Sequence, residues 1–209
     1  MNITLESVSK SFKNVTVLDD INCVFSSGNI YGVVGKNGSG KTMLLRTIAG
    51  LIIPTKGTVS FNGKALHKEL SFPPNLGIII EKPEFLGYLS GLENLRQIAM
   101  INNRITDAEI RDYMKLFSLD PDSKLPVRKY SLGMKQKIGI IQAIMEDPDI
   151  IVLDEPFNAL DEQTVILLRD LLLQLKEKGK LIILTSHHKD DIESICNEVI
   201  FLEDGRIAA

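Results

Sequence analysis

The strongest constraint on this chain is a glycine-rich loop that stands between an apolar run and a helix-like segment. Residues 35–42 read Gly-Lys-Asn-Gly-Ser-Gly-Lys-Thr, after the apolar run 30–34 and before the helical pattern of 43–49. A strand, a G-x-x-x-x-G-K-[ST] loop and a helix in this order are typical of a site whose backbone amides surround phosphate groups. Lys41 would reach the outer phosphates, and the Thr42 hydroxyl would bind Mg²⁺. A glycine-rich turn without a ligand is the alternative, but it requires motif and context to coincide by chance. The predicted phosphate contacts are Gly35, Lys36, Asn37, Gly38, Ser39, Gly40, Lys41 and Thr42.

Composition limits the class of protein. With 209 residues, 44% hydrophobic and 24% charged, the chain predicts a globular protein with one large domain, or a domain with an insertion. Its net charge of -3 gives no sign of the excess of basic residues typical of nucleic-acid binding, so no nucleic acid partner is expected. No run approaches the roughly 18 apolar residues of a membrane span, which predicts a cytoplasmic protein. Cys23 and Cys196 lie far apart in sequence, and we interpret both as reduced packing residues.

Strands alternate with helices along most of the chain, which predicts an α/β fold with a mostly parallel sheet and helices on both faces. Before the glycine loop, partly alternating apolar residues predict short strands on either side of a polar turn at Lys13 and Asn14, and hence a small N-terminal antiparallel sheet. The continuous apolar runs 76–80 and 150–153 predict strands buried on both faces.

Between about residues 83 and 130 the apolar pattern becomes helical. Thr106 and Glu109 have the spacing of a capping box at the start of one of these helices. We expect a single domain spanning residues 1–209, with residues 83–130 as an inserted α-helical subdomain.

Two acids end the apolar run 150–153. Asp154 and Glu155 would lie at the carboxyl end of a buried strand, where open parallel sheets bind ligands. Beside a phosphate-binding loop, Asp154 would hold Mg²⁺, and Glu155 would orient the water that attacks the terminal phosphate. The alternative is an acidic turn that caps the next helix.

Three further segments carry a family resemblance. Tyr-Ser-Leu-Gly-Met-Lys-Gln at residues 130–136 is similar to the L-S-G-G-Q signature of ATP-binding cassette ATPases. Asn-Ala-Leu-Asp at 158–161 resembles the D-loop of that family, and Thr-Ser-His at 185–187 resembles its switch-histidine segment. Because the order and spacing agree over nearly the whole chain, the sequence resembles the nucleotide-binding subunit of an ATP-binding cassette (ABC) transporter, with a P-loop NTPase fold.

The resemblance implies a site completed by a second protomer. Ser131 and Gly133 would contact ATP that is held by a partner, in a homodimer or beside a paired ABC ATPase subunit. Asp161 belongs to the D-loop, and His187 would contact the terminal phosphate and link it to Glu155. The resemblance also implies partnership with transmembrane permease subunits, and a peripheral position on the inner face of the membrane. A simple helix cap is the alternative for the signature segment.

Three positions need separate comment. Phe12 stands where the family places an aromatic ring under adenine, but a core position is the alternative. Glu81 replaces the usual Q-loop glutamine and would add a third negative charge near the metal. It would therefore either ligate Mg²⁺ or have a raised pKa without nucleotide. Met43 replaces a common second hydroxyl residue, so its amide still contacts phosphate, while a side-chain bond of about 0.5 to 1.5 kcal/mol is missing.

These features predict an ATPase that energises a separate permease, with ATP and Mg²⁺ as cofactors. Glu81 and the segment 131–136 resemble the ATPases of bacitracin-resistance and lantibiotic-immunity exporters, which implies export of a peptide antibiotic or a similar compound. The permease would dock on the helical subdomain, where Phe85 and Leu86 are expected to be exposed. The alternatives are a non-transport ABC ATPase that acts on RNA or DNA, and a regulatory module with little turnover.

Overall fold

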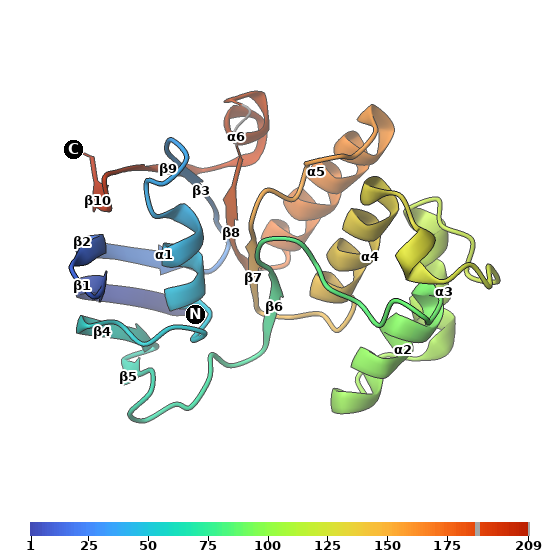
Figure 1. Ribbon diagram of the computed structural model, residues 1–209, viewed down its shortest axis with the longest axis horizontal. Coiled ribbons are helices and arrows are strands. Elements are labelled where there is room, and N and C mark those ends of the chain that lie inside the picture. Colours follow the sequence, from blue (N-terminus) through green and yellow to red (C-terminus); the bar gives the residue numbers. More distant parts are fainter. Residues whose placement is uncertain (187–188, 209) are drawn as a thin grey trace.

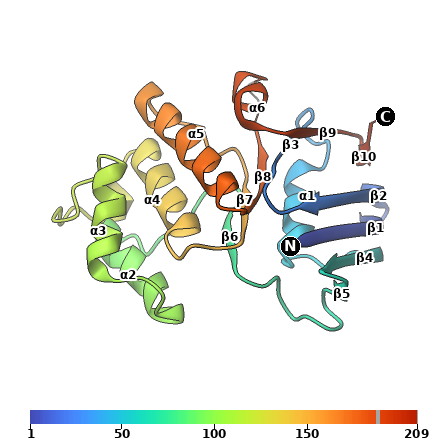
Figure 2. The ribbon, with the colours of Figure 1, turned by 180° about the vertical axis from the view of Figure 1, so that it is seen from behind.

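A computed structural model describes residues 1–186 and 189–208 of the chain. A central sheet divides the molecule (Figure 1). A small antiparallel sheet and one helix lie on one side of it, and most of the other helices lie on the opposite side, an arrangement that the view from behind repeats (Figure 2).

The central sheet has six strands in the order β10-β9-β3-β8-β7-β6. These strands are β3 (Ile30–Val34), β6 (Leu76–Ile79), β7 (Ile150–Leu153), β8 (Leu181–Thr185), β9 (Glu198–Glu203) and β10 (Arg206–Ile207). All neighbouring pairs are parallel except β9 with β10. The prediction of a mostly parallel sheet is therefore confirmed. Because β3, β7 and β8 run side by side in one direction, the segments that follow their carboxyl ends meet at one edge of the sheet.

Burial along the strands follows their position in the sheet. Every residue of β7 and β8 is buried, as the apolar runs predict. In β6, Gly77 and Ile79 are buried, but Leu76 and Ile78 are only half-buried. The prediction of a strand buried on both faces is therefore wrong for β6. The reason is its place at the end of the sheet, which the run of apolar residues does not reveal.

The N-terminal part forms a second sheet of four strands, in the order β2-β1-β4-β5. Its strands are β1 (Asn2–Phe12), β2 (Val15–Ser26), β4 (Lys56–Phe61) and β5 (Lys64–Ala65). The expected short strands are thus one long hairpin, which turns where Lys13 has a positive φ of 52°. Register shifts between Leu5 and Val8 and between Val8 and Lys10 explain why the apolar alternation is only partial.

Each face of the central sheet packs on a different layer. Helix α1 (Lys41–Ile48) and the antiparallel sheet cover one face, and α4 (Leu132–Ile144), α5 (Glu162–Glu177) and α6 (Lys189–Ile195) contribute to the layer on the other. The side chains that face α1 are Ile150, Val152, Leu181 and Ile183, and those that face the larger helical layer are Ile151, Leu153, Ile182 and Leu184. The alternate residues of two buried strands therefore tie the two layers together.

The segment between β6 and α4 contains α2 (Gly91–Asn102), α3 (Asp107–Leu116) and the short helix η1 (Val127–Lys129). The capping box of Thr106 and Glu109 is present at the start of α3 as predicted, and Ser90 with Glu93 forms a second box at the start of α2. Both boxes satisfy backbone amides that have no partner inside the helix.

The two cysteines are free thiols, which confirms their predicted reduced state. Both are half-buried, and burial raises the pKa of Cys23 and of Cys196 to about 12. Within the described part of the chain, no helix has the length and apolar character that a membrane crossing requires.

Gly77 lets helix α4 and the loop after it approach the edge strand β6. A Cβ atom at this position would lie 1.8 Å from the carbonyl oxygen of Ala143 and 2.9 Å from a ring carbon of Pro148. A side chain of any size would therefore push the helical layer away from the sheet.

We predict that Gly77→Ala lowers the free energy of unfolding by at least about 2 kcal/mol, because the added methyl group meets backbone rather than a movable side chain. Urea denaturation followed by circular dichroism measures this change. Gly87→Ala is the matched control, since its Cβ would lie 3.4 Å from the Cβ of Arg128, an ordinary contact distance. Equal stability of the two variants would contradict the packing account.

Candidate functional site: a phosphate-binding loop beside two acids

The loop between β3 and α1 is closely held by backbone contacts. A Cβ atom at Gly35 would lie 2.2 Å from the carbonyl oxygen of Leu202. Gly40 caps α1 with φ 106°, a left-handed conformation that favours glycine, and a Cβ there would lie 2.8 Å from the carbonyl oxygen of Val17. The loop therefore requires glycine at these positions and leads directly into the N-terminus of α1.

Lys41 is buried at the start of α1 and bends back over the loop. Its ammonium donates to the carbonyl oxygens of Gly35 at 2.7 Å and Lys36 at 3.2 Å. The Ser39 hydroxyl is buried and has no hydrogen-bond partner among the residues that the structure describes. A buried polar group of this kind needs a partner, and a bound phosphate would supply one. The loop therefore fits an anionic ligand.

Asp154 is the point where four elements meet. Its carboxylate accepts from the Thr42 hydroxyl at 2.8 Å and from the Thr185 hydroxyl at 2.7 Å. Its backbone amide donates to the carbonyl oxygen of Ile79 at 2.7 Å. The carboxylate is buried, and these bonds fix it at the joint edge of α1, β6, β7 and β8.

The oxygen atoms of Thr42 and Asp154 fit a hard cation such as Mg²⁺. Such a cation prefers oxygen ligands and completes its shell with water and substrate phosphates. Among residues 1–186 and 189–208, no cluster of three His, Cys, Asp or Glu side chains suitable for a metal ion is found. A metal at Thr42 and Asp154 would complete its shell with water and phosphate oxygens.

Glu155 follows Asp154 in a left-handed conformation with φ 51°. Its backbone amide donates to the Thr185 hydroxyl at 2.8 Å, so one buried hydroxyl holds both acids. Strain of this kind persists only where the surroundings fix it.

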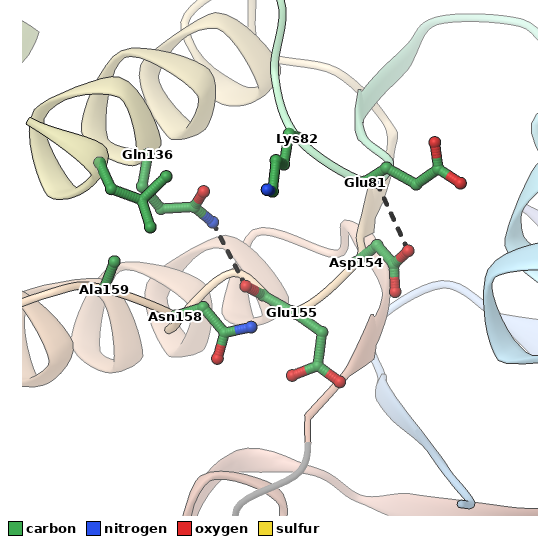
Figure 3. Close-up of a pocket in the computed structure, with 8 residues that line it drawn as sticks. Glu81, Lys82, Gln136, Asp154, Glu155, Asn158 and Ala159 are labelled. Carbon is green, nitrogen blue, oxygen red and sulfur yellow. Dashed lines mark hydrogen bonds between the residues drawn. The ribbon is translucent and has the colours of Figure 1, made fainter. Parts of the chain in front are cut away.

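Glu155 and Asp154 both line two adjacent cavities. The first has about 280 Å³ and is lined by Val17, Asn37, Gly38, Gly40, Lys41, Thr42, Met43, Asp154 and Glu155. The second has about 310 Å³ and is lined by Glu81, Lys82, Leu132, Gln136, Asp154, Glu155, Asn158 and Ala159 (Figure 3).

Glu81 has a partner that the sequence analysis did not find. Its carboxylate forms an ion pair with Arg46 of α1 at 2.7 Å, while its backbone amide lies 3.4 Å from a carboxylate oxygen of Asp154. From the sequence, Glu81 is expected either to bind magnesium or to have a raised pKa, and neither alternative includes a cation 35 residues earlier in the chain. The role of Glu81 as a metal ligand stays a prediction.

The signature segment starts helix α4. Ser131 is the N-cap, and its hydroxyl accepts from the Met134 amide at 3.1 Å. A Cβ atom at Gly133 would lie 2.6 Å from the carbonyl oxygen of Ala159, so the D-loop backbone passes close to this helix. Ser131 and Gly133 line neither of the two cavities, although Leu132 and Gln136 of the same segment line the second. Neither cavity therefore joins Ser131 or Gly133 to the phosphate-binding loop.

Two side chains of α4 connect it to the segment after the acids. Gln136, which the sequence analysis did not single out as a site residue, donates to the carbonyl oxygens of Glu155 at 3.3 Å and Pro156 at 3.1 Å. Lys137 donates to Asp161 at 3.0 Å. Asp161 also caps α5 by accepting from the Thr164 amide at 2.9 Å. The Lys137 ammonium and the Thr164 hydroxyl hold the pKa of Asp161 well below its usual range.

Two predicted site residues remain, Phe12 and His187, and the structure describes only Phe12. Phe12 is 46% exposed, with the Lys10 ammonium 4.9 Å from its ring centroid, so the alternative of a core position is wrong. Its contact with adenine stays a prediction.

His187 lies outside the described residues. The preceding Ser186 donates to Asp191 at 2.9 Å, and Asp191 in turn pairs with Arg169 at 2.5 Å.

We predict that Thr185→Val lowers the free energy of unfolding by about 2 kcal/mol, because it leaves the buried Asp154 carboxylate and the Glu155 amide each without one partner. Thr185→Ser keeps the hydroxyl and loses one methyl group, so a loss of only about 1 kcal/mol is expected. Chemical denaturation of both variants measures the difference. A valine variant as stable as the serine variant would show that these two bonds contribute little.

Comparison with known proteins agrees with this geometry. The family model described as ABC transporter matches residues 18–158. YybJ of Bacillus subtilis, an ABC transporter ATP-binding protein, is 45% identical over 98% of this chain and 94% of its own length. The bacitracin transport ATP-binding protein BcrA of Enterococcus faecalis is 33% identical over 98% of this chain and 67% of its own length.

Solved structures give the same fold. An ATP-binding subunit of an ABC transporter matches with a TM-score of 0.90 and 28% identity, over 100% of this chain and 89% of that one. The dimeric structure of a bacterial ABC transporter cassette matches with a TM-score of 0.89, over 99% of this chain and 97% of that one. At 24% identity it shows the fold alone. The matches do not favour a cassette protein that acts on RNA or DNA. This chain belongs to the ABC transporter family, as an ATP-binding and ATP-hydrolysing subunit.

Proposed function

We propose that the chain hydrolyses Mg-ATP at a site shared by two cassette subunits, and that this reaction energises a separate membrane permease. The observation that carries the proposal is the set of bonds from Thr42 through Asp154 and Thr185 to Glu155, which joins the phosphate-binding loop to both acids. A site with this arrangement can bind the phosphates, hold a cation and present a base to water.

The loop and the start of α1 would hold the phosphates. The contacts are the amides of residues 35–43, with Lys41 moving its ammonium from the loop carbonyls to the outer phosphates. Met43 contributes only its amide. Thr42 and Asp154 would hold Mg²⁺, with Glu81 as a third candidate. When bound, the cation neutralises charge on the phosphates.

Glu155 would act on the attacking water. Its place after the buried β7, fixed through its amide by Thr185, presents the carboxylate at the cavity beside the phosphate-binding loop. An acceptor at that point can orient a water molecule and take up its proton. We assign the contact with the terminal phosphate to His187 by resemblance to the family. Phe12 would provide the flat face for adenine.

The second half of the site would come from the partner subunit, a second copy of this chain or a paired cassette. Ser131 and Gly133 start a helix, and helix N-termini bind anions, but these residues line neither cavity of their own chain. The D-loop residue Asp161 would connect the two subunits. Hydrolysis would then require two chains that face each other head to tail.

The surface near Glu81 and α2 would dock the permease and so place the subunit at the inner face of the membrane. Tyr88 is 69% exposed and Leu86 is exposed beside it, as predicted for Leu86. Phe85, expected to be exposed, is instead half-buried, because it packs on the hydrophobic core.

For the transported compound, we propose a peptide antibiotic or a similar molecule. BcrA is named a bacitracin transport ATP-binding protein, and SrtF of Streptococcus pyogenes, 29% identical over 98% of this chain and 88% of its own length, is named a lantibiotic transport ATP-binding protein. Both names describe those relatives, and Glu81 together with the segment 131–136 is what this chain has in common with the same branch.

We predict that Glu155→Gln keeps ATP binding but lowers hydrolysis by at least about 100-fold, because the amide cannot take the proton from water. With Mg-ATP, the variant accumulates as a dimer. Phosphate release and multi-angle light scattering measure the two effects. Glu177→Gln, which makes the same charge change at an exposed residue of α5, is the control and should behave like the wild type. Unchanged turnover in Glu155→Gln would remove Glu155 from its proposed role.

A further inference from the structure

The ion pair between Arg46 and Glu81 joins two segments that both lead to the metal position. Arg46 lies in the last turn of α1, one helical turn beyond Thr42. Glu81 follows β6, at the start of the segment that leads to α2. Their side chains are 33% and 57% exposed, and the closest guanidinium nitrogen and carboxylate oxygen are 2.7 Å apart.

The backbone of Glu81 brings a third carboxylate to the two acids. Its amide lies 3.4 Å from the Asp154 carboxylate, and Figure 3 shows Asp154 between the side chains of Glu81 and Glu155. Glu81 also has a positive φ of 60°, which a non-glycine residue keeps only under constraint. The Glu81 backbone is therefore held at Asp154, while its carboxylate pairs with Arg46.

Charge explains why a partner is needed at this position. Carboxylates that are neighbours repel one another, and a cation beside one of them offsets this repulsion. Arg46 is the cation that the structure places on Glu81. Magnesium bound at Thr42 and Asp154 would be a second cation within reach of the same carboxylate.

We propose that Arg46 is a positioning residue that holds the Glu81 carboxylate away from the metal position, so that Arg46 and the metal compete for it. The proposal rests on the proposed function, because it assumes that the metal binds at Thr42 and Asp154. Exposed ion pairs are weak, so the exchange between the two cations changes metal affinity only severalfold. The exchange would also give the loop after β6 two positions. In one, Glu81 pairs with Arg46 of α1, and in the other, Glu81 contacts the bound metal.

Four proteins test the competition: the wild type, Arg46→Gln, Glu81→Gln and the double variant. Each is saturated with a nonhydrolysable ATP analogue, and Mn²⁺ binding is measured by electron paramagnetic resonance. We expect Arg46→Gln to tighten Mn²⁺ binding about two- to fivefold, because it frees Glu81. Glu81→Gln weakens binding, and in the double variant the loss of Arg46 has no further effect. Arg46→Lys keeps the charge and should bind Mn²⁺ like the wild type.

Two controls separate the proposal from its rivals. Arg111→Gln removes an equally exposed, ion-paired arginine from α3 and should leave Mn²⁺ binding unchanged. Binding of the analogue in EDTA should also be equal in the wild type and Arg46→Gln. The proposal is overturned if Arg46→Gln has no effect on Mn²⁺, or has the same effect when Glu81 is already Gln, which would mean that Arg46 acts on the metal or phosphates directly. If the wild type binds the analogue but no Mn²⁺, the metal position of the proposed function itself is wrong.

Discussion

The buried carboxylate of Asp154 is the interaction on which the rest of the site depends. A charge removed from water must be matched by hydrogen-bond donors, and here they come from Thr42 on α1 and Thr185 at the end of β8. The amide of Asp154 adds a bond to Ile79 at the end of β6. Asp154 thus joins the start of α1 to the ends of β6, β7 and β8, and the Thr185 hydroxyl that bonds to it also holds the amide of Glu155.

Polar contacts connect the helical layer to this centre, in addition to the apolar packing of β7 and β8. Gln136 reaches the carbonyl oxygen of Glu155, and Lys137 pairs with Asp161 at the start of α5. On the opposite side, the pair of Arg46 and Glu81 connects α1 to the loop that leads to the helices. Hydrogen bonds and ion pairs of this kind are easily exchanged, whereas the apolar contacts of β7 and β8 are not.

The sequence predicts the features that are local and misses those that depend on distant contacts. The glycine loop, the acids after β7 and the capping box of α3 each depend on a few adjacent residues, so their pattern alone predicts them. Gln136 and Arg46 were missed because their partners are remote in sequence, and no spacing rule connects them. The burial of β6 was predicted wrongly because an apolar run does not tell an edge strand from a central one.

We propose that each chain carries two half-sites that work only with a partner chain. The most direct test mixes Lys41→Ala, whose phosphate-binding loop is impaired, with Ser131→Arg, whose signature is blocked. Each variant alone should hydrolyse almost no ATP. Mixed dimers have one intact composite site, so mixing equal amounts should restore up to about a quarter of wild-type phosphate release, given independent sites and random pairing. Activity no greater than the sum of the separate variants would contradict the shared site.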